Sequence, residues 1–99
     1  MINAEIATTI IKQLGGINRL VSMIGANLFV ARDKGVQFTF QGCRKANKVT
    51  IDLQSSDTYK VTFWNFTPKA WRLIHTFEDV YADRLIPVFE EFTGLYLTL

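Results

Sequence analysis

Few residues in this chain could carry out catalysis. There is a single histidine, His75, and a single cysteine, Cys43. They could form a base and a nucleophile only if the fold brought them together and a third group oriented the imidazole. His75 stands in an alternating run of large apolar residues, which is typical of a partly buried structural histidine. Cys43 has cationic neighbours that would favour its thiolate, but nothing beside it indicates a reaction. We therefore expect no catalytic residue.

Acidic residues gather near the C-terminus, where they could bind a cation. Asp79 and Asp83 are four residues apart and would share one face of a helix. Such carboxylates are better explained as stabilising a helix N-terminus, because the helix dipole is positive there. Gly15-Gly16 follows no predicted strand, so it lacks the context of a phosphate-binding loop. The sequence predicts no metal site and no cofactor.

Positively charged residues form the one grouping that favours a binding role. Residues 32–72 contain eight Lys and Arg against three Asp, a net charge of +5, whereas residues 73–99 have a net charge of −4. These charges either neutralise one another across the fold or steer a charged partner toward one face. The candidate partner-binding residues are Arg32, Lys34, Arg44, Lys45, Lys48, Lys60, Trp64 and Phe66.

Two classes of partner fit this set. Another protein is the leading hypothesis, because catalytic groups are lacking and the charges are separated along the sequence. Nucleic acid is the alternative, since aromatic rings can stack on bases while cations hold phosphates. Lys69, Arg72 and Trp71 would extend such a surface. The sequence lacks the Gly-aromatic motif that is typical of RNA-binding sheets.

Two helices are predicted before the strands. In the first, apolar residues recur every four positions from Ile6 to Leu14, with Asn3 as its N-cap and Gly15-Gly16 as its end. The second is expected to begin at Asn18 and to end before Gly25. A helix pair of this kind can read DNA, but the second helix has too few exposed polar side chains for that role. We favour a helical hairpin packed on a sheet.

The middle of the chain alternates apolar and polar residues with period two, which predicts an antiparallel sheet with one buried face. The predicted strands are residues 28–32, 36–40, 48–53, 59–63 and 70–77. The polar face, rich in Thr, Lys and Gln, is expected to meet solvent. After Phe63 the pattern slips, so that Trp64 and Phe66 fall on the polar face. Either a bulge turns Trp64 inward or this end of the face carries exposed rings, and we favour the buried position.

A third helix is predicted from Asp79, its N-cap, to about Thr93. Pro87 must either kink this helix or mark the first turn of a shorter one. Residues 95–99 alternate again, which predicts a short terminal strand docked at an edge. Its leucines could instead join two copies of the chain in a homodimer; they are Leu95, Leu97 and Leu99.

These elements predict an α+β fold. It comprises two N-terminal helices, a three- to five-stranded antiparallel sheet, a C-terminal helix and a short terminal strand. With 99 residues, 48% of them hydrophobic, we expect one α+β domain over residues 1–99. A lone cysteine excludes a secreted disulfide scaffold. No leader peptide and no run of roughly 18 apolar residues occurs, so we expect a cytoplasmic protein without membrane association.

Several segments resemble small phage-encoded proteins of unknown function. The similar stretches are residues 11–16, residues 25–27, Arg44-Lys45-Ala46-Asn47, residues 76–83 and Thr93-Gly94-Leu95-Tyr96. The resemblance spans most of the chain and implies a phage or prophage source, hence the host cytoplasm, with no assigned catalytic residue. By analogy of size and source, it implies that the partner is a host or phage protein and that the chain inhibits a host defence complex, as anti-CRISPR proteins do.

Overall fold

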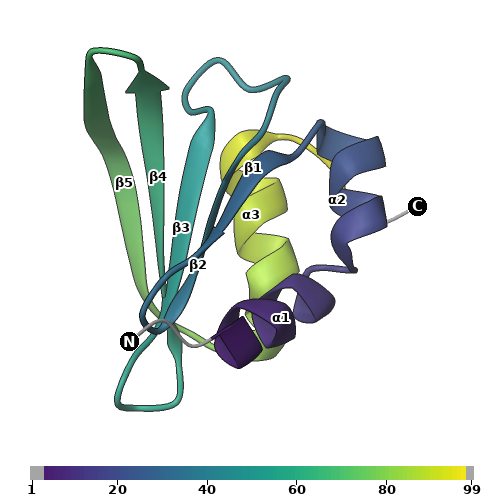
Figure 1. Cartoon of the computed structure of the whole chain (residues 1–99), viewed down its shortest axis with the longest axis vertical. Helices are drawn as coiled ribbons and strands as arrows, with labels where there is room; N and C mark the ends of the chain where they lie inside the picture. The colour runs from purple at the N-terminus through teal and green to yellow at the C-terminus, as the bar shows by residue number, and fades with distance from the viewer. Residues whose placement is uncertain (1–3, 98–99) are drawn as a thin grey trace.

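The computed structural model describes residues 4–97, which form an α+β fold of three α-helices and a five-stranded antiparallel sheet (Figure 1). The strands follow one another in space in the order β1-β2-β3-β4-β5. In chain order the elements are α1 (Ala4–Gln13), α2 (Ile17–Ile24), β1 (Asn27–Ala31), β2 (Gly35–Thr39), β3 (Lys48–Leu53), β4 (Tyr59–Thr67), β5 (Ala70–Val80), a short 3-10 helix η1 (Ala82–Arg84) and α3 (Leu85–Thr93).

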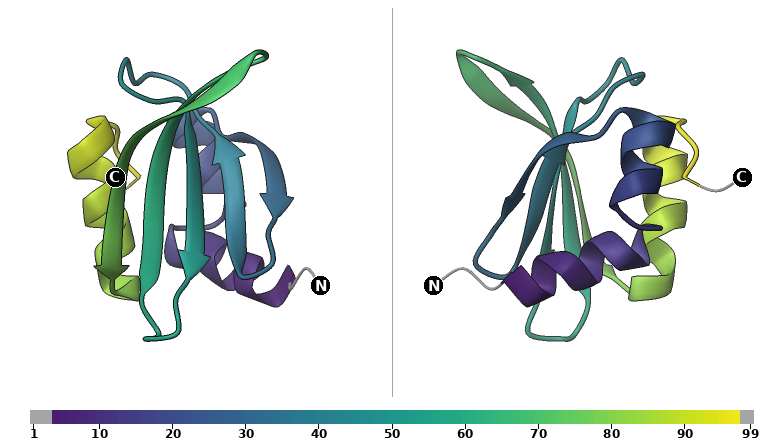
Figure 2. Two further views of the ribbon diagram at one scale, coloured as in Figure 1. Left: turned by 90° about the vertical axis from the view of Figure 1, so that its left-hand side faces the viewer. Right: turned by 45° about the vertical axis from the view of Figure 1, so that its right-hand side comes forward.

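The helices all pack on one side of the sheet. Figure 1 shows α1, α2 and α3 to the right of the strands, and the left view of Figure 2 looks onto the opposite face, which no helix covers. We call this opposite face the open face. The β4–β5 hairpin extends beyond the other strands and leans away from the helices (Figure 2). The fold therefore has two layers, one of which leaves a whole sheet surface uncovered.

The core lies between the sheet and the helices, as the alternation of the strands predicts. Ile10 and Leu20 of the helices and Leu14, directly after α1, are fully buried, and they meet the apolar face of the strands. One half of the core is aromatic, because Phe63 is surrounded by rings from neighbouring elements. The rings that contact Phe63 are Phe40, Phe77, Phe89 and Phe92, with centroid distances of 4.3–6.5 Å. Such ring contacts stabilise the fold beyond the area that they bury.

A bulge does lie beside Phe63, but it is in β5 and not in β4. Phe63 pairs with His75, but the next residue, Trp64, pairs with Leu73, so Ile74 has no partner on β4. The extra residue belongs to β5, and β4 keeps its alternation. Trp64 consequently lies on the open face and is only half-buried. The expectation that a bulge turns Trp64 into the core is therefore wrong.

Two helix starts differ from the sequence prediction. The second helix begins at Ile17, with Gly16 rather than Asn18 at its N-cap. The third begins at Leu85, because β5 continues to Val80 and the chain then forms η1. Pro87 therefore lies in the first turn of a shorter helix, where its missing N–H costs nothing. The predicted cap of the first helix, Asn3, lies outside the described residues.

Of the expected terminal strand, residues 95–97 belong to none of the five strands of the described structure, and residues 98 and 99 lie outside it. Gly94 adopts a left-handed conformation, with φ of 75°, and ends α3. The backbone N–H of Leu97 then donates to Oε2 of Glu90 at 2.7 Å, and the Leu97 side chain is fully buried. Leu97 is thus buried within the fold and Leu95 is half-buried, and the dimer contact stays a prediction. Leu99 lies beyond the described residues.

Candidate partner-binding site

Three aromatic rings meet at the hairpin end of the open face. They are Trp64 and Phe66 of β4 and Trp71 of β5, and we call them the aromatic platform. Phe66 and Trp71 are directly paired across the hairpin. The Trp71 ring centroid lies 5.6 Å from that of Trp64 and 5.6 Å from that of Phe66, in edge-to-face geometry. Trp71 is 43% exposed, which is a large exposed area for a tryptophan that contacts two other rings.

Lys48, the first residue of β3, contacts two rings of the aromatic platform. Its ammonium lies 3.7 Å from the centroid of Trp71 and 4.2 Å from that of Phe66, so two ring faces attract one charge. The Lys48 side chain is almost fully enclosed, with 5% of its surface exposed. Burial, and to a lesser extent the charge of Arg32, lower the pKa of Lys48 below its ordinary value. Lys48 is therefore a support for the rings rather than a free cation.

Hydroxyl groups line the centre of the open face beneath the platform. The indole Nε1 of Trp64 donates to Oγ1 of Thr50 at 3.1 Å. Thr62 pairs with Thr50 on one side and with Thr76 on the other, and the hydroxyls of Thr62 and Thr76 are 3.5 Å apart. Thr50 and Thr62 are buried although no helix covers them. The open face, which was expected to meet solvent, is thus shielded from water in part by its own side chains.

Asn47 ties the loop between β2 and β3 to the hairpin. Its side-chain amide donates to the carbonyl of Phe66 at 2.8 Å, and its Oδ1 accepts from the Phe66 N–H at 2.7 Å. Its backbone N–H donates to the carbonyl of Trp64 at 3.0 Å. These bonds extend the sheet past Lys48, so the loop and the hairpin form one end of the molecule.

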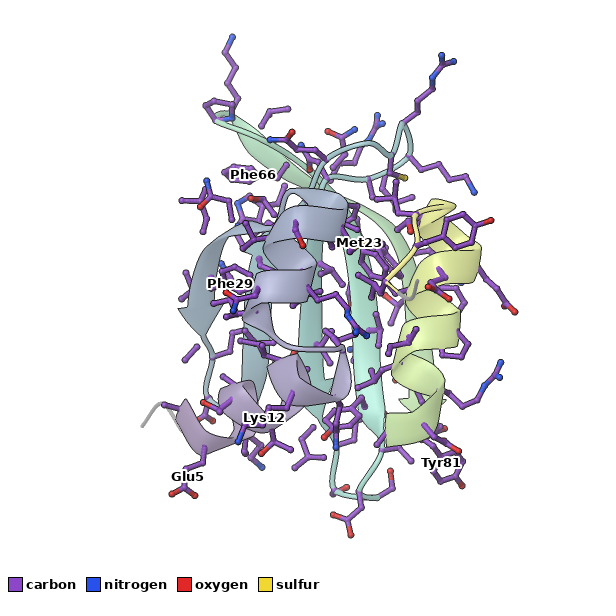
Figure 3. All side chains as sticks on the ribbon, turned by 90° about the vertical axis from the view of Figure 1, so that its right-hand side faces the viewer. Glu5, Lys12, Met23, Phe29, Phe66 and Tyr81 are labelled. Carbon is purple, nitrogen blue, oxygen red and sulfur yellow. The ribbon has the colours of Figure 1, made fainter. Side chains whose placement is uncertain are left out.

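This end of the molecule is basic. Arg44 in the loop and Lys69 and Arg72 in the hairpin are exposed. Neither residues 34–51 nor residues 58–77 contain an Asp or Glu. Figure 3 shows several nitrogen-tipped side chains projecting from the end where Phe66 lies, with Tyr81 at the opposite end. The exposed rings are consequently bordered by cations in the two segments that form this end.

The other predicted binding residues are not part of this group. Arg32 lies toward the opposite end of the open face, where its Nε donates to Asp52 Oδ1 at 2.9 Å and its Nη1 to Gln37 Oε1 at 3.1 Å. Lys34, in the β1–β2 turn, and Lys60, opposite Asp52, are exposed at the same end.

Lys45 faces a different layer. Its ammonium donates to the carbonyl of Phe92 at 3.2 Å and lies 5.1 Å from the centroid of that ring. It therefore supports the C-terminal end of α3. Of the predicted set, the structure brings Lys48, Trp64 and Phe66 together around Trp71, places Arg44 in the loop at the same end of the molecule, and separates the other four.

The predicted set left out three residues that complete the site, namely Lys69, Trp71 and Arg72. The sequence indicates them only as an extension of a nucleic-acid-binding surface. A tight turn at Thr67-Pro68 is the signal that could have found them, because it places residue 71 opposite residue 66 on the same face.

The residues considered for catalysis and for metal binding are not part of the aromatic platform. His75 is exposed at the sheet edge and not partly buried as expected, and its ring stacks on Phe92 with a centroid distance of 5.8 Å. Cys43 is half-buried in the loop before β3. Within residues 4–97, no group of three or more His, Cys, Asp or Glu could hold a metal ion. None of the helices formed by these residues is long and apolar enough to span a membrane.

The chain matches no protein-family model, and no curated protein or solved structure is significantly similar to it. The resemblance to phage-encoded proteins therefore stays a prediction. Function has to be argued from the geometry of the site itself.

Proposed function

We propose that this protein is a non-enzymatic binding protein that engages a negatively charged macromolecular partner through the hairpin end of its open face. The observation that carries the proposal is the coincidence of exposed rings and exposed cations at one end of an uncovered sheet. Trp71 is the most exposed ring of the platform, and Lys69 and Arg72 flank it in sequence.

The residue types at this end are those that contribute strongly to binding in known interfaces. Tryptophan and arginine are enriched among the residues whose loss weakens protein complexes most. Arg44 and Arg72 have planar guanidinium groups that suit carboxylates and phosphates equally. Leu73, next to Trp64 across the hairpin, is 55% exposed and adds apolar contact area. The chemistry supports an anionic partner, whether protein or nucleic acid.

A narrower form of the proposal is that the partner belongs to a host defence complex. It rests on the resemblance to phage-encoded proteins alone. Gene neighbourhood and inhibition assays with a defence complex would test it independently of the binding surface.

Charge reversal at the hairpin is expected to weaken retention on a heparin column, which serves as a generic polyanion probe. The variant K69E/R72E should elute at a clearly lower salt concentration than the wild type, because exposed charges within about a Debye length of the polyanion contribute directly to binding. The measurement is the salt concentration at elution from a linear gradient.

The matched control is K12E/R84E, which has the same net charge but alters exposed residues of α1 and η1. This control should elute close to the wild type. Equal shifts for the two double variants would mean that heparin senses only the net charge, and the proposed site would be wrong.

A further inference from the structure

We infer that the partner at this surface is single-stranded nucleic acid, with an unstacked base lying on Trp71 and phosphates held by Arg44, Lys69 and Arg72. The inference rests on the proposed function and assigns its partner class. It is carried by the geometry of the rings, by the charge complementarity of the surrounding cations and by the absence of acidic residues from both segments that form this end.

Trp71 is held ready for stacking before any partner arrives. The edges or faces of Trp64 and Phe66 contact it, and the Lys48 ammonium lies 3.7 Å from its centroid on one side. Although that side is taken, 43% of the residue is exposed. A ring fixed in this way loses little conformational freedom on binding, which favours affinity.

The exposed cations at this end come from the hairpin and from the loop between β2 and β3. Lys69 and Arg72 are in the hairpin, and Arg44 is in the loop that Asn47 bonds to β4. Lys48 is excluded from a role in holding phosphate, because it is enclosed by the rings. Proteins that hold single strands without reading their sequence combine aromatic rings, which stack on the bases, with surrounding cations, which hold the phosphates.

A single strand fits this surface better than a duplex. A base can stack on a protein ring only where its face is free, and base pairing and stacking cover those faces in a double helix. An acidic protein could pair with the exposed cations, but its binding would not require the Trp71 ring, which the Lys48 ammonium holds in place from one side.

The test is fluorescence anisotropy with a labelled oligothymidine of about ten nucleotides, competed by unlabelled single strand, by a duplex of equal length and by poly-glutamate. The single strand should compete about tenfold more strongly than either of the others. Trp71→Ala should weaken binding by about tenfold, and Trp71→Phe should retain much of the affinity because a flat ring remains. With three phosphates held, the logarithm of the affinity should fall with the logarithm of salt with a slope of about −2.

The matched control is Tyr81→Ala, because Tyr81 is an aromatic residue, 65% exposed, at the opposite end of the molecule. This variant should bind like the wild type. Equal competition by duplex or poly-glutamate, or no effect of Trp71→Ala, would overturn the inference. If heparin retention still depends on Lys69 and Arg72 in that case, the proposed function stands and the partner is another polyanion. If Trp71→Ala leaves oligothymidine binding unchanged and K69E/R72E leaves heparin retention unchanged, both the inference and the proposed function would be wrong.

Discussion

Replacing Phe63 with alanine is expected to lower the free energy of unfolding by about 3–5 kcal/mol. Phe63 is fully buried, and four other phenylalanine rings contact it, so the truncation leaves a cavity that no neighbour can fill without moving. A loss of this size is a large part of the roughly 5–15 kcal/mol that stabilises a domain of this length. Urea denaturation, followed by tryptophan fluorescence, measures it.

The control for this prediction is Tyr81→Ala, a truncation of an exposed ring. It should change the free energy of unfolding by no more than about 0.5 kcal/mol. If Phe63→Ala cost no more than Tyr81→Ala, the aromatic half of the core would not be packed as described.

Replacing Lys48 with glutamate is expected to destabilise the protein by about 3 kcal/mol or more. The substitution places a carboxylate where two ring faces converge, and ring faces repel negative charge. With 5% of its surface exposed, position 48 gives the carboxylate little access to water. The loss appears as a lower midpoint in thermal and urea unfolding.

Lys48→Met separates the effect of charge from that of packing. Methionine has a similar length and an adaptable apolar side chain, so its stability should lie within about 1.5 kcal/mol of the wild type. Wild-type stability in Lys48→Glu would indicate that the side chain lies in water and that the rings do not enclose it. Because Lys48→Glu is expected to disturb the aromatic platform itself, loss of binding in that variant says nothing about phosphate contacts.

The fold class could be predicted because each strand carries its own signal. The alternation in residues 36–40, 48–53 and 59–63 is strict, and it identifies the buried face correctly at Phe38, Ile51 and Phe63. Short polar connections between these strands leave an antiparallel sheet as the simplest arrangement.

The errors occur where tertiary context overrides a local pattern. The side chain of Trp64 looks suited to a core, but the bulge lies in β5, so β4 keeps its alternation and Trp64 stays on the open face, paired with Leu73. Asp79 looks like a helix cap, but it lies in β5 with a positive φ of 56°, where its backbone N–H donates to Gln54. Neither pairing partner can be read from the local sequence.

The candidate site could be predicted only in part, because it too depends on contacts between residues far apart in the sequence. Arg44, Trp64 and Phe66 were recognised by residue type and lie where rings and cations meet. Lys48 was expected to be an exposed cation because it starts an alternating strand, but the rings that enclose it come from β4 and β5. Lys45 was grouped with its neighbour in sequence, although it contacts α3.

The most direct test of the central claim uses the indole N–H signals of the protein. The chain has two tryptophans, Trp64 and Trp71, and both belong to the aromatic platform. In proton–nitrogen NMR, titration with oligothymidine should shift both indole signals and the backbone signals of residues 66–72, while those of α1 stay in place. Shifts confined to the helices, with both indole signals unchanged, would contradict the account.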